Sequence, residues 1–295
     1  MMNITFWGTR GSIASPGPET MRYGGNTSCV ELRASNQIVI FDAGTGIRQL
    51  GDKLLKEFAD TSLTLHIFIS HTHWDHIQGF PFFLPAYRQK NYIHLYGPPG
   101  RDKSLNELMK VQMSTDYFPV ELGSMTPNFE IHEVREDFSV GPLTVQQFYL
   151  NHPALCIAYR VSDGVNSVVY ATDNEPYMGS LESTLHKNAT AVDFPIYLDE
   201  KFVNFLSDAD LYIGEAQYTE DEYQEKRGWG HSSLETTVRF AVQANVKRLA
   251  LFHHDPLHDD QFVDGMVTQA KEHIALLNGT VECFGAREGL QISLP

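Results

Sequence analysis

Short runs of apolar and β-branched residues recur along the whole chain, and turn-forming residues separate them. Runs of this length, with continuous or alternating apolar positions, are typical of strands in sheets that bury at least one face. The pattern predicts strands at 3–8, 28–33, 37–42, 63–70, 92–97, 143–150, 155–161, 167–172, 210–216, 248–254 and 289–294.

Several helices are expected between these strands. Apolar residues at helical spacing predict helices at 47–58, 233–244 and 259–277. Ser232 and Glu235 form an S-x-x-E pattern that caps the start of the second helix. Asn278 and Gly279 favour the left-handed conformation that ends the third. Because no Pro/Gly/Ser-rich linker divides the chain, we expect a single α/β domain over residues 1–295.

One segment, 176–208, breaks the alternation of strands and helices. We expect an inserted cap or interaction segment there. Such an insertion could cover the protein's own site or the site of a second copy, so a homodimer is compatible with the sequence.

Composition narrows the classes of partner. The 295 residues are 42% hydrophobic and carry a net charge of −15, with no cluster of Lys or Arg. Long nucleic acids are usually bound by basic surfaces that displace counterions, so an extended DNA or RNA footprint is not expected. A small phosphorylated substrate remains compatible, because metal ions can supply the positive charge.

The cysteines and the N-terminus indicate the compartment. Cys29, Cys156 and Cys283 are widely spaced in apolar stretches, which predicts buried free thiols and no disulfide framework. The first residues lack a signal-peptide pattern, and no apolar run is long enough to span a membrane. We therefore expect a soluble cytoplasmic protein.

The segment SHTHWDH (70–76) carries the most specific chemical signal. His71 and His73 lie two residues apart just after a predicted strand, so both side chains can face one metal ion. Asp75 and His76 can turn toward a second ion. Ordinary surface or core histidines are the alternative, but three imidazoles beside a carboxylate would repel one another when protonated. A bound divalent cation removes that conflict.

Further candidate ligands follow later strands. His152, Asp173, His253 and His254 each come directly after a strand-like run. Taken singly, each could be an ordinary polar residue at a strand end. Taken together with the first cluster, they predict one metal site assembled at one edge of the sheets.

These motifs resemble the metallo-β-lactamase superfamily over nearly the whole chain. The resemblance also includes GTRGS (8–12) and FDAGTG (41–46), where Asp42 matches the aspartate of the superfamily's first motif. It implies a four-layer αβ/βα sandwich of two mixed β-sheets, with the metal site along one edge.

Three further segments are similar to the ribonuclease Z-like, phosphodiesterase branch: LYGPPG (95–100), GEAQY (214–218) and GHSS (230–233). Glu215 stands in the place of that branch's glutamate. Counted from His231, the last ligand of the branch falls on His253, and His254 becomes its neighbour.

The resemblance implies two divalent ions and a division of the ligands between them. One ion would be bound by His71, His73 and His152, the other by Asp75, His76 and His253, and Asp173 would bridge the two. Zn²⁺ is the default for this N/O set, and Mn²⁺ or Fe²⁺ suits it as well.

The same resemblance implies a mechanism in which a hydroxide between the ions attacks phosphorus. Asp75 would orient the hydroxide or accept its proton. His231 would protonate the leaving oxygen, and Glu215 would hold the other ring nitrogen and raise the pKa of His231. The alternative for His231 is a neighbour of a helix N-cap with no chemical role.

A small phosphodiester, such as a cyclic nucleotide, is the expected substrate. Transfer-RNA 3′ processing is disfavoured, because the substrate-binding arm of ribonuclease Z enzymes is missing between His152 and Asp173. Tyr117, Phe118 and Trp229 are loop aromatics that could stack on a base, although packing is their commoner role.

Three other functions remain open. A carbon-ester hydrolase of the lactonase, thioesterase or lactamase type would use the same metals, but those branches do not generally carry the pairing of Glu215 with His231. A non-catalytic binding protein would be expected to have a degraded ligand set. A redox di-iron protein would have a glutamate in place of His73.

Overall fold

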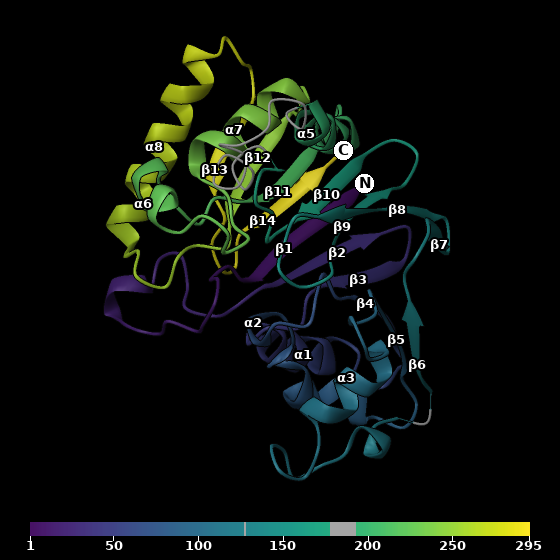
Figure 1. Cartoon of the computed structure of the whole chain (residues 1–295). Coiled ribbons are helices and arrows are strands. Elements are labelled where there is room, and N and C mark those ends of the chain that lie inside the picture. The colour runs from purple at the N-terminus through teal and green to yellow at the C-terminus, as the bar shows by residue number, and fades with distance from the viewer. Residues whose placement is uncertain (127, 178–192) are drawn as a thin grey trace.

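Two seven-stranded sheets pack face to face in the computed structural model, which describes residues 1–126, 128–177 and 193–295. Helices cover the outer side of each sheet, so the layers follow the order helix, sheet, sheet, helix (Figure 1). This is the four-layer αβ/βα sandwich that the sequence resemblance implies, and that expectation is confirmed.

The first sheet has the order β14-β1-β2-β3-β4-β5-β6. Pairing is antiparallel from β14 to β3 and parallel from β3 to β6, so the sheet is mixed. Its strands are β1 (Met2–Gly8), β2 (Cys29–Ala34), β3 (Gln37–Phe41), β4 (Thr64–Phe68), β5 (Tyr92–Gly97), β6 (Phe129–Glu133) and β14 (Gln291–Leu294).

The second sheet has the order β13-β12-β11-β10-β9-β8-β7. It is parallel from β13 to β10 and antiparallel from β10 to β7. Its strands are β7 (Phe138–Val140), β8 (Leu143–Leu150), β9 (Cys156–Ser162), β10 (Ser167–Ala171), β11 (Leu211–Glu215), β12 (Arg248–Phe252) and β13 (Glu282–Gly285).

The described helices fall into two outer layers and several short connectors. They are α1 (Ile47–Glu57), α2 (Trp74–Ile77), α3 (Leu105–Gln112), α5 (Asp193–Leu206), α6 (Glu220–Glu225), α7 (Leu234–Gln243) and α8 (Asp260–Leu276). Short 3₁₀ helices lie at Pro18–Thr20, Phe80–Phe82, Leu84–Tyr87 and Leu122–Ser124. Apolar faces of α1 and α3 pack on the first sheet, and those of α5, α7 and α8 pack on the second.

Aromatic side chains fill the space between the sheets. Phe68 on β4 is fully buried, and its ring centre lies 5.0 Å from that of Tyr159 and 5.4 Å from that of Phe138, both on the second sheet. Phe41 stacks on Tyr170 with ring centres 5.0 Å apart. These contacts join the two sheets close to the strand ends that carry the predicted ligands.

The three strands that the apolar pattern did not predict are all at sheet edges. They are β6, β7 and β13. An edge strand has one unpaired side and can be short or partly exposed, so its apolar signal is weak. The apolar runs of β6, β7 and β13 are therefore too short and too exposed to predict strands.

Helix starts show both a correction and two missed signals. The N-cap of α7 is Ser233, whose hydroxyl accepts a hydrogen bond from the backbone N–H of Thr236, so the predicted cap at Ser232 was wrong. Ser232 instead donates its hydroxyl to the carbonyl of Asn174. Ser104 caps α3 and Thr219 caps α6, each in a complete capping box.

Part of the segment 176–208 is described. Residues 193–206 form α5, which lies between the parallel strands β10 and β11 in sequence and packs on the second sheet through Phe202 and Leu206. Residues 178–192 lie outside the described part of the chain, so the expected cap stays a prediction.

Two smaller expectations concern the cysteines and the membrane. All three cysteines are free and buried, as predicted. Among the described helices, none is both long and apolar enough to cross a membrane.

We expect Phe68→Ala to lower the free energy of unfolding by about 3–5 kcal/mol, because it removes a buried ring that contacts both sheets. Urea unfolding measures this change. Val165→Ala is the control: Val165 is 83% exposed in the turn between β9 and β10, and we expect a change of about 0.5 kcal/mol or less. Equal effects of the two substitutions would show that the inter-sheet aromatic packing is not a major source of stability.

Candidate metal centre

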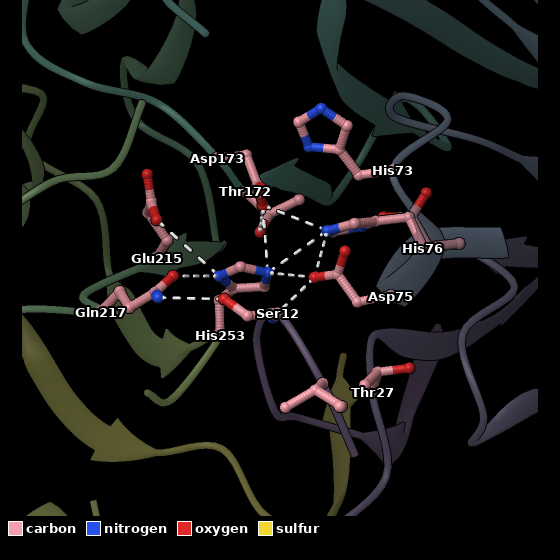
Figure 2. A network of polar contacts seen from close by, with 12 residues as sticks. Ser12, Thr27, His73, Asp75, His76, Thr172, Asp173, Glu215, Gln217 and His253 are labelled. Atoms are coloured by element: carbon pink, nitrogen blue, oxygen red, sulfur yellow. Dashed lines mark hydrogen bonds and ion pairs between the residues drawn. The ribbon is translucent and has the colours of Figure 1, made fainter. Parts of the chain in front are cut away.

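The ends of several strands meet at one edge of the sandwich and bring the predicted ligands together. The segment 71–76 follows β4, His152 follows β8, Asp173 follows β10 and His253 follows β12. The side chains of His73, Asp75, His76, Asp173 and His253 converge there (Figure 2). All seven ligands that the sequence predicts lie in this cluster, whereas ligation itself stays a prediction.

The backbone is left-handed just after three strands around the cluster, β3, β10 and β12. Asp42 has φ 58°, Asp173 φ 56° and His253 φ 60°. Non-glycine residues rarely adopt this conformation, and its cost is about 1–3 kcal/mol at each position. The sharp turn aims each side chain into the cluster directly after its strand ends.

The first group of donor atoms comprises those of His71, His73, His152 and Asp173. Nδ1 of His73 lies 3.1 Å from Nε2 of His152, and Nε2 of His71 lies 3.5 Å from Oδ2 of Asp173. Nε2 of His71 is buried and makes no hydrogen bond within the described residues. A buried nitrogen without a partner is costly unless something else binds it.

The second group comprises Asp75, His76 and His253. Oδ2 of Asp75 lies 3.1 Å from Nε2 of His76 and 3.2 Å from Nε2 of His253. The two Nε2 atoms are 3.2 Å apart. Three donor atoms thus form a nearly equilateral triangle.

Asp173 lies between the groups and turns one oxygen toward each. Its Oδ2 faces His71, and its Oδ1 lies 3.3 Å from Nε2 of His76 and 3.2 Å from Nε2 of His253. This placement agrees with the bridging position that the resemblance implies for Asp173.

The separations suit a metal ion. Ligand bonds of about 2.0–2.1 Å in tetrahedral geometry place neighbouring donor atoms about 3.3–3.4 Å apart. The separations given above, from 3.1 to 3.5 Å, lie close to this value, and Nε2 of His152 lies farther from Oδ2 of Asp173, at 3.9 Å. Together with the unpartnered nitrogen of His71, they make the cluster suited to divalent metal binding.

The pKa shifts of the clustered side chains also favour a bound divalent ion. Burial lowers the pKa of His71 well below its ordinary value. Burial by itself would raise the pKa of Asp75, but His76 and His253 hold it far below the usual range. Burial would lower the pKa of His76, yet Asp75 and Asp173 raise it. The carboxylates therefore require positive charge inside the cluster, which a divalent ion supplies in place of a proton on His76.

The carboxylate of Asp42 contacts the cluster at the ring nitrogen of His76 that faces away from the other donor atoms. It accepts hydrogen bonds from the backbone N–H of Ser70 at 2.7 Å, the Ser70 hydroxyl at 2.8 Å and the Tyr170 hydroxyl at 2.6 Å. Its Oδ2 also lies 2.7 Å from Nδ1 of His76. This contact orients Nε2 of His76 toward the other donors, as carboxylates commonly do for metal-binding histidines.

The two adjacent histidines after β12 have different environments. His253 directs Nε2 into the cluster, and its Nδ1 lies 2.9 Å from Oε1 of Gln217 (Figure 2). Nε2 of His254 donates to the carbonyl of Ala286 at 2.8 Å, and the ring packs edge-on against Tyr23. The geometry favours His253 as the ligand and gives His254 a structural contact.

His231 and Glu215 form the expected pair. Nδ1 of His231 lies 2.9 Å from Oε2 of Glu215, and the backbone N–H groups of Asn174 and Ser232 also donate to this carboxylate. Burial lowers the pKa of His231, because loss of hydration outweighs the nearby carboxylates of Asp173 and Asp75, so the expected rise of this pKa was wrong. Burial and the nearby Asp173 raise the pKa of Glu215.

Sequence reasoning missed several supporting residues. The backbone N–H of Ser12 donates to Oδ2 of Asp75 at 2.7 Å. Glu175 accepts hydrogen bonds from the backbone N–H groups of Gly228 and Gly230, and the carbonyl of Gly230 lies 2.9 Å from Nδ1 of His152. These partners are backbone groups far away in sequence, so no residue spacing could reveal them.

Gly230 shows why this loop requires glycine. Its φ is 89°, and a Cβ there would lie 2.3 Å from Nδ1 of His152. Both the left-handed backbone and the close approach exclude a side chain.

The cluster opens into a recess of about 410 Å³, lined by Ser12, Thr72, His73, Trp74, Asp75, Asp173 and His231. A substrate in this recess would therefore contact Asp75 and His231 from the solvent side.

A second group of histidines lies on β5 and β6, separate from the recess. Nδ1 of His94 lies 3.2 Å from Nε2 of His132, with ring centres 5.5 Å apart. His73 and His152 have nearly the same nitrogen separation but ring centres only 4.8 Å apart. The nitrogens of His94 and His132 thus face each other head-on, as in an N–H···N hydrogen bond, which prefers a linear arrangement.

Comparisons with known proteins give the family and the fold. A model of the beta-lactamase superfamily domain matches residues 37–254. Ribonuclease Z from Prochlorococcus marinus subsp. pastoris is 26% identical, covering 86% of this chain and 88% of its own length. The metallo-beta-lactamase fold protein YhfI from Bacillus subtilis has a TM-score of 0.68 at 19% identity, covering 99% of this chain and 98% of its own. Unliganded yeast PDE1 has a TM-score of 0.69 at 15% identity, covering 99% of both chains.

The two structural likenesses concern the fold alone, whereas the family model also covers the site. The matched segment contains all seven predicted ligands together with Glu215 and His231. The chain therefore belongs to the beta-lactamase superfamily.

Proposed function

We propose that the protein is a binuclear metal-dependent phosphodiesterase that hydrolyses a small phosphodiester such as a cyclic nucleotide. The pairing of His231 with Glu215 carries this proposal, because it places an oriented imidazole in the wall of the recess that also exposes Asp75 and Asp173. Superfamily membership supports hydrolysis, and the ribonuclease among the relatives supports phosphorus as the centre attacked.

The proposal assigns one ion to His71, His73 and His152, the other to Asp75, His76 and His253, and both to Asp173. Zn²⁺ is the first expectation for this mixture of imidazole and carboxylate, and Mn²⁺ or Fe²⁺ is also compatible with it. When bound, the ions would supply the positive charge that activates water and offsets charge on the phosphoryl oxygens.

Asp75 is suited to act on the attacking water. The backbone N–H of Ser12 fixes Oδ2, and the side chain lines the recess. Its pKa lies far below the usual range, so it is ionised and accepts hydrogen bonds. We assign it the role of orienting the water.

His231 is suited to protonate the leaving oxygen. Glu215 holds Nδ1, so Nε2 is the nitrogen free to act on a substrate in the recess. Because burial lowers the pKa of His231, a proton on Nε2 is transferred more readily than from an exposed imidazole. Glu215 acts through His231 as a positioning residue.

Transfer-RNA 3′ processing is the second candidate, and the relatives named ribonuclease Z favour it. Two features oppose it. Between His152 and Asp173 the chain forms only β9, a turn at 163–166 and β10, which leaves no arm for a large RNA. The net charge of −15 would also repel a phosphate backbone.

A turnover screen tests the reaction class. We expect the protein loaded with Zn²⁺ or Mn²⁺ to hydrolyse bis(4-nitrophenyl) phosphate and at least one cyclic mono- or dinucleotide, measured by absorbance and chromatography. Lactone and thioester substrates and a precursor transfer RNA are the comparison set. Fast lactone opening without phosphodiester cleavage would favour the carbon-ester alternative, and site-specific RNA cleavage would favour the second candidate.

We expect His231→Ala to lower kcat about 10²–10⁴-fold and to leave the metal content unchanged, because it removes a proton donor and no ligand. Steady-state kinetics and elemental analysis measure the two quantities. His273→Ala, in the last turn of α8, is the matched control and should retain full turnover. Loss of an ion from His231→Ala would instead place His231 among the ligands.

The adjacent histidines provide a test of the ligand assignment. We expect His253→Ala to retain about one ion per chain and His254→Ala to retain two, because only His253 faces Asp75 and His76. Elemental analysis of protein shown to be folded by circular dichroism measures this difference. The reverse pattern would move the ligand to His254.

A further inference from the structure

An apolar recess adjoins the candidate metal centre. It has a volume of about 400 Å³, and its walls include Trp74, Ile77, Pro81, Phe82, Val111 and Tyr117. Thr72 and Trp74 line both this recess and the one that contains Asp75 and His231. The two recesses therefore adjoin at these residues, so a molecule bound at the metal centre that passes them enters the apolar recess.

Large apolar side chains are unusually exposed here. Trp74 is 77% exposed, Tyr117 75% and Phe82 53%. Single exposed apolar residues are ordinary, but a group of them around a hollow is typical of a binding site. Trp74 lies between two predicted ligands in sequence. Asp75 on one side is buried, whereas His73 on the other side and the ring of Trp74 are exposed.

Contacts between lining residues hold the walls of the recess in place. Phe82 packs edge-on against Phe118 with ring centres 5.2 Å apart. Nε2 of Gln112 on α3 donates to the carbonyl of Ile77 on α2 at 2.8 Å. The recess is thus formed before any ligand enters, which lowers the entropic cost of binding.

The chemistry of the walls defines the occupant. Among the described lining residues, none carries a charged side chain, so a neutral group is favoured. A flat aromatic ring would present its faces to Trp74 and Tyr117.

His231 lines the metal-centre recess but not the apolar one. If His231 protonates the leaving oxygen, the leaving group lies on the same side of the metal centre as His231. The substituent that stays on phosphorus then extends past Trp74.

We propose that the apolar recess binds an aromatic heterocycle of the nucleobase class on the retained side of the phosphodiester, with Trp74 and Tyr117 as stacking faces. This inference rests on the proposed phosphodiesterase function. It makes Trp74 and Tyr117 specificity-determining residues.

Two diesters with the same leaving group test the proposal: bis(4-nitrophenyl) phosphate and methyl 4-nitrophenyl phosphate. Their chemistry at the leaving oxygen is the same, whereas only the first retains an aromatic ring. We expect wild-type KM to be roughly 5- to 100-fold lower for the bis-aryl diester, as expected from the strength of ring stacking. We also expect Trp74→Ala to remove most of this difference and Trp74→Phe to restore it.

Tyr117→Ala is the second variant, because Trp74 adjoins two predicted ligands and its replacement could disturb the metals. We expect it to raise KM for the bis-aryl diester in the same direction. Tyr92→Ala is the matched control: Tyr92 is 48% exposed at the start of β5, does not line the recess and should leave this KM unchanged. The metal content of every variant is measured alongside.

The outcomes separate the two proposals. Equal wild-type KM values for the two diesters, or a KM that rises as much in Tyr92→Ala as in Trp74→Ala and Tyr117→Ala, would overturn the recess assignment and leave the phosphodiesterase function intact. Absence of turnover of both diesters would overturn the phosphodiesterase function itself.

Discussion

The buried carboxylate of Asp42 is the interaction on which the rest of the site depends. It accepts hydrogen bonds from Ser70 after β4 and from Tyr170 on β10, and it contacts Nδ1 of His76. One side chain therefore ties the ends of strands from both sheets and orients a predicted ligand. Because a buried carboxylate is costly without partners, the fold must keep these groups together. The two sheets are thus held in register at the edge where the chemistry is expected.

The fold stores strain at this edge and offsets it in the core. Asp42, Asp173 and His253 all adopt left-handed backbone directly after a strand. The aromatic packing of Phe41, Phe68, Tyr159 and Tyr170 between the sheets lies just below these turns. A rigid core of this kind can hold donor atoms at separations that suit a metal ion, whereas a mobile loop would let them spread.

The two recesses beside the candidate metal centre have different expected roles. His231 and Asp75 line the polar recess, where protons are to be moved, and Trp74 and Tyr117 line the apolar recess beside it. The strongly acidic chain offers little general attraction to phosphate. Affinity for a phosphodiester would then depend on local features: the metal ions for the phosphate and ring stacking for the substituent. This division favours a small substrate over a long nucleic acid.

The sequence by itself determined the alternation of strands and helices, because buried strands need apolar runs. It also determined the metal-binding character of SHTHWDH, because three imidazoles and a carboxylate in six residues conflict without a cation. The edge strands β6, β7 and β13 escaped prediction, since an edge requires fewer apolar residues. The role of Ser12 escaped prediction because it acts through its backbone N–H. The role of Glu175 escaped prediction because its carboxylate binds the backbone N–H of the distant Gly230. Only the tertiary structure could place His253 rather than His254 in the cluster and set Trp74 facing a recess. Both depend on how distant strand ends and helices pack, which no local spacing encodes.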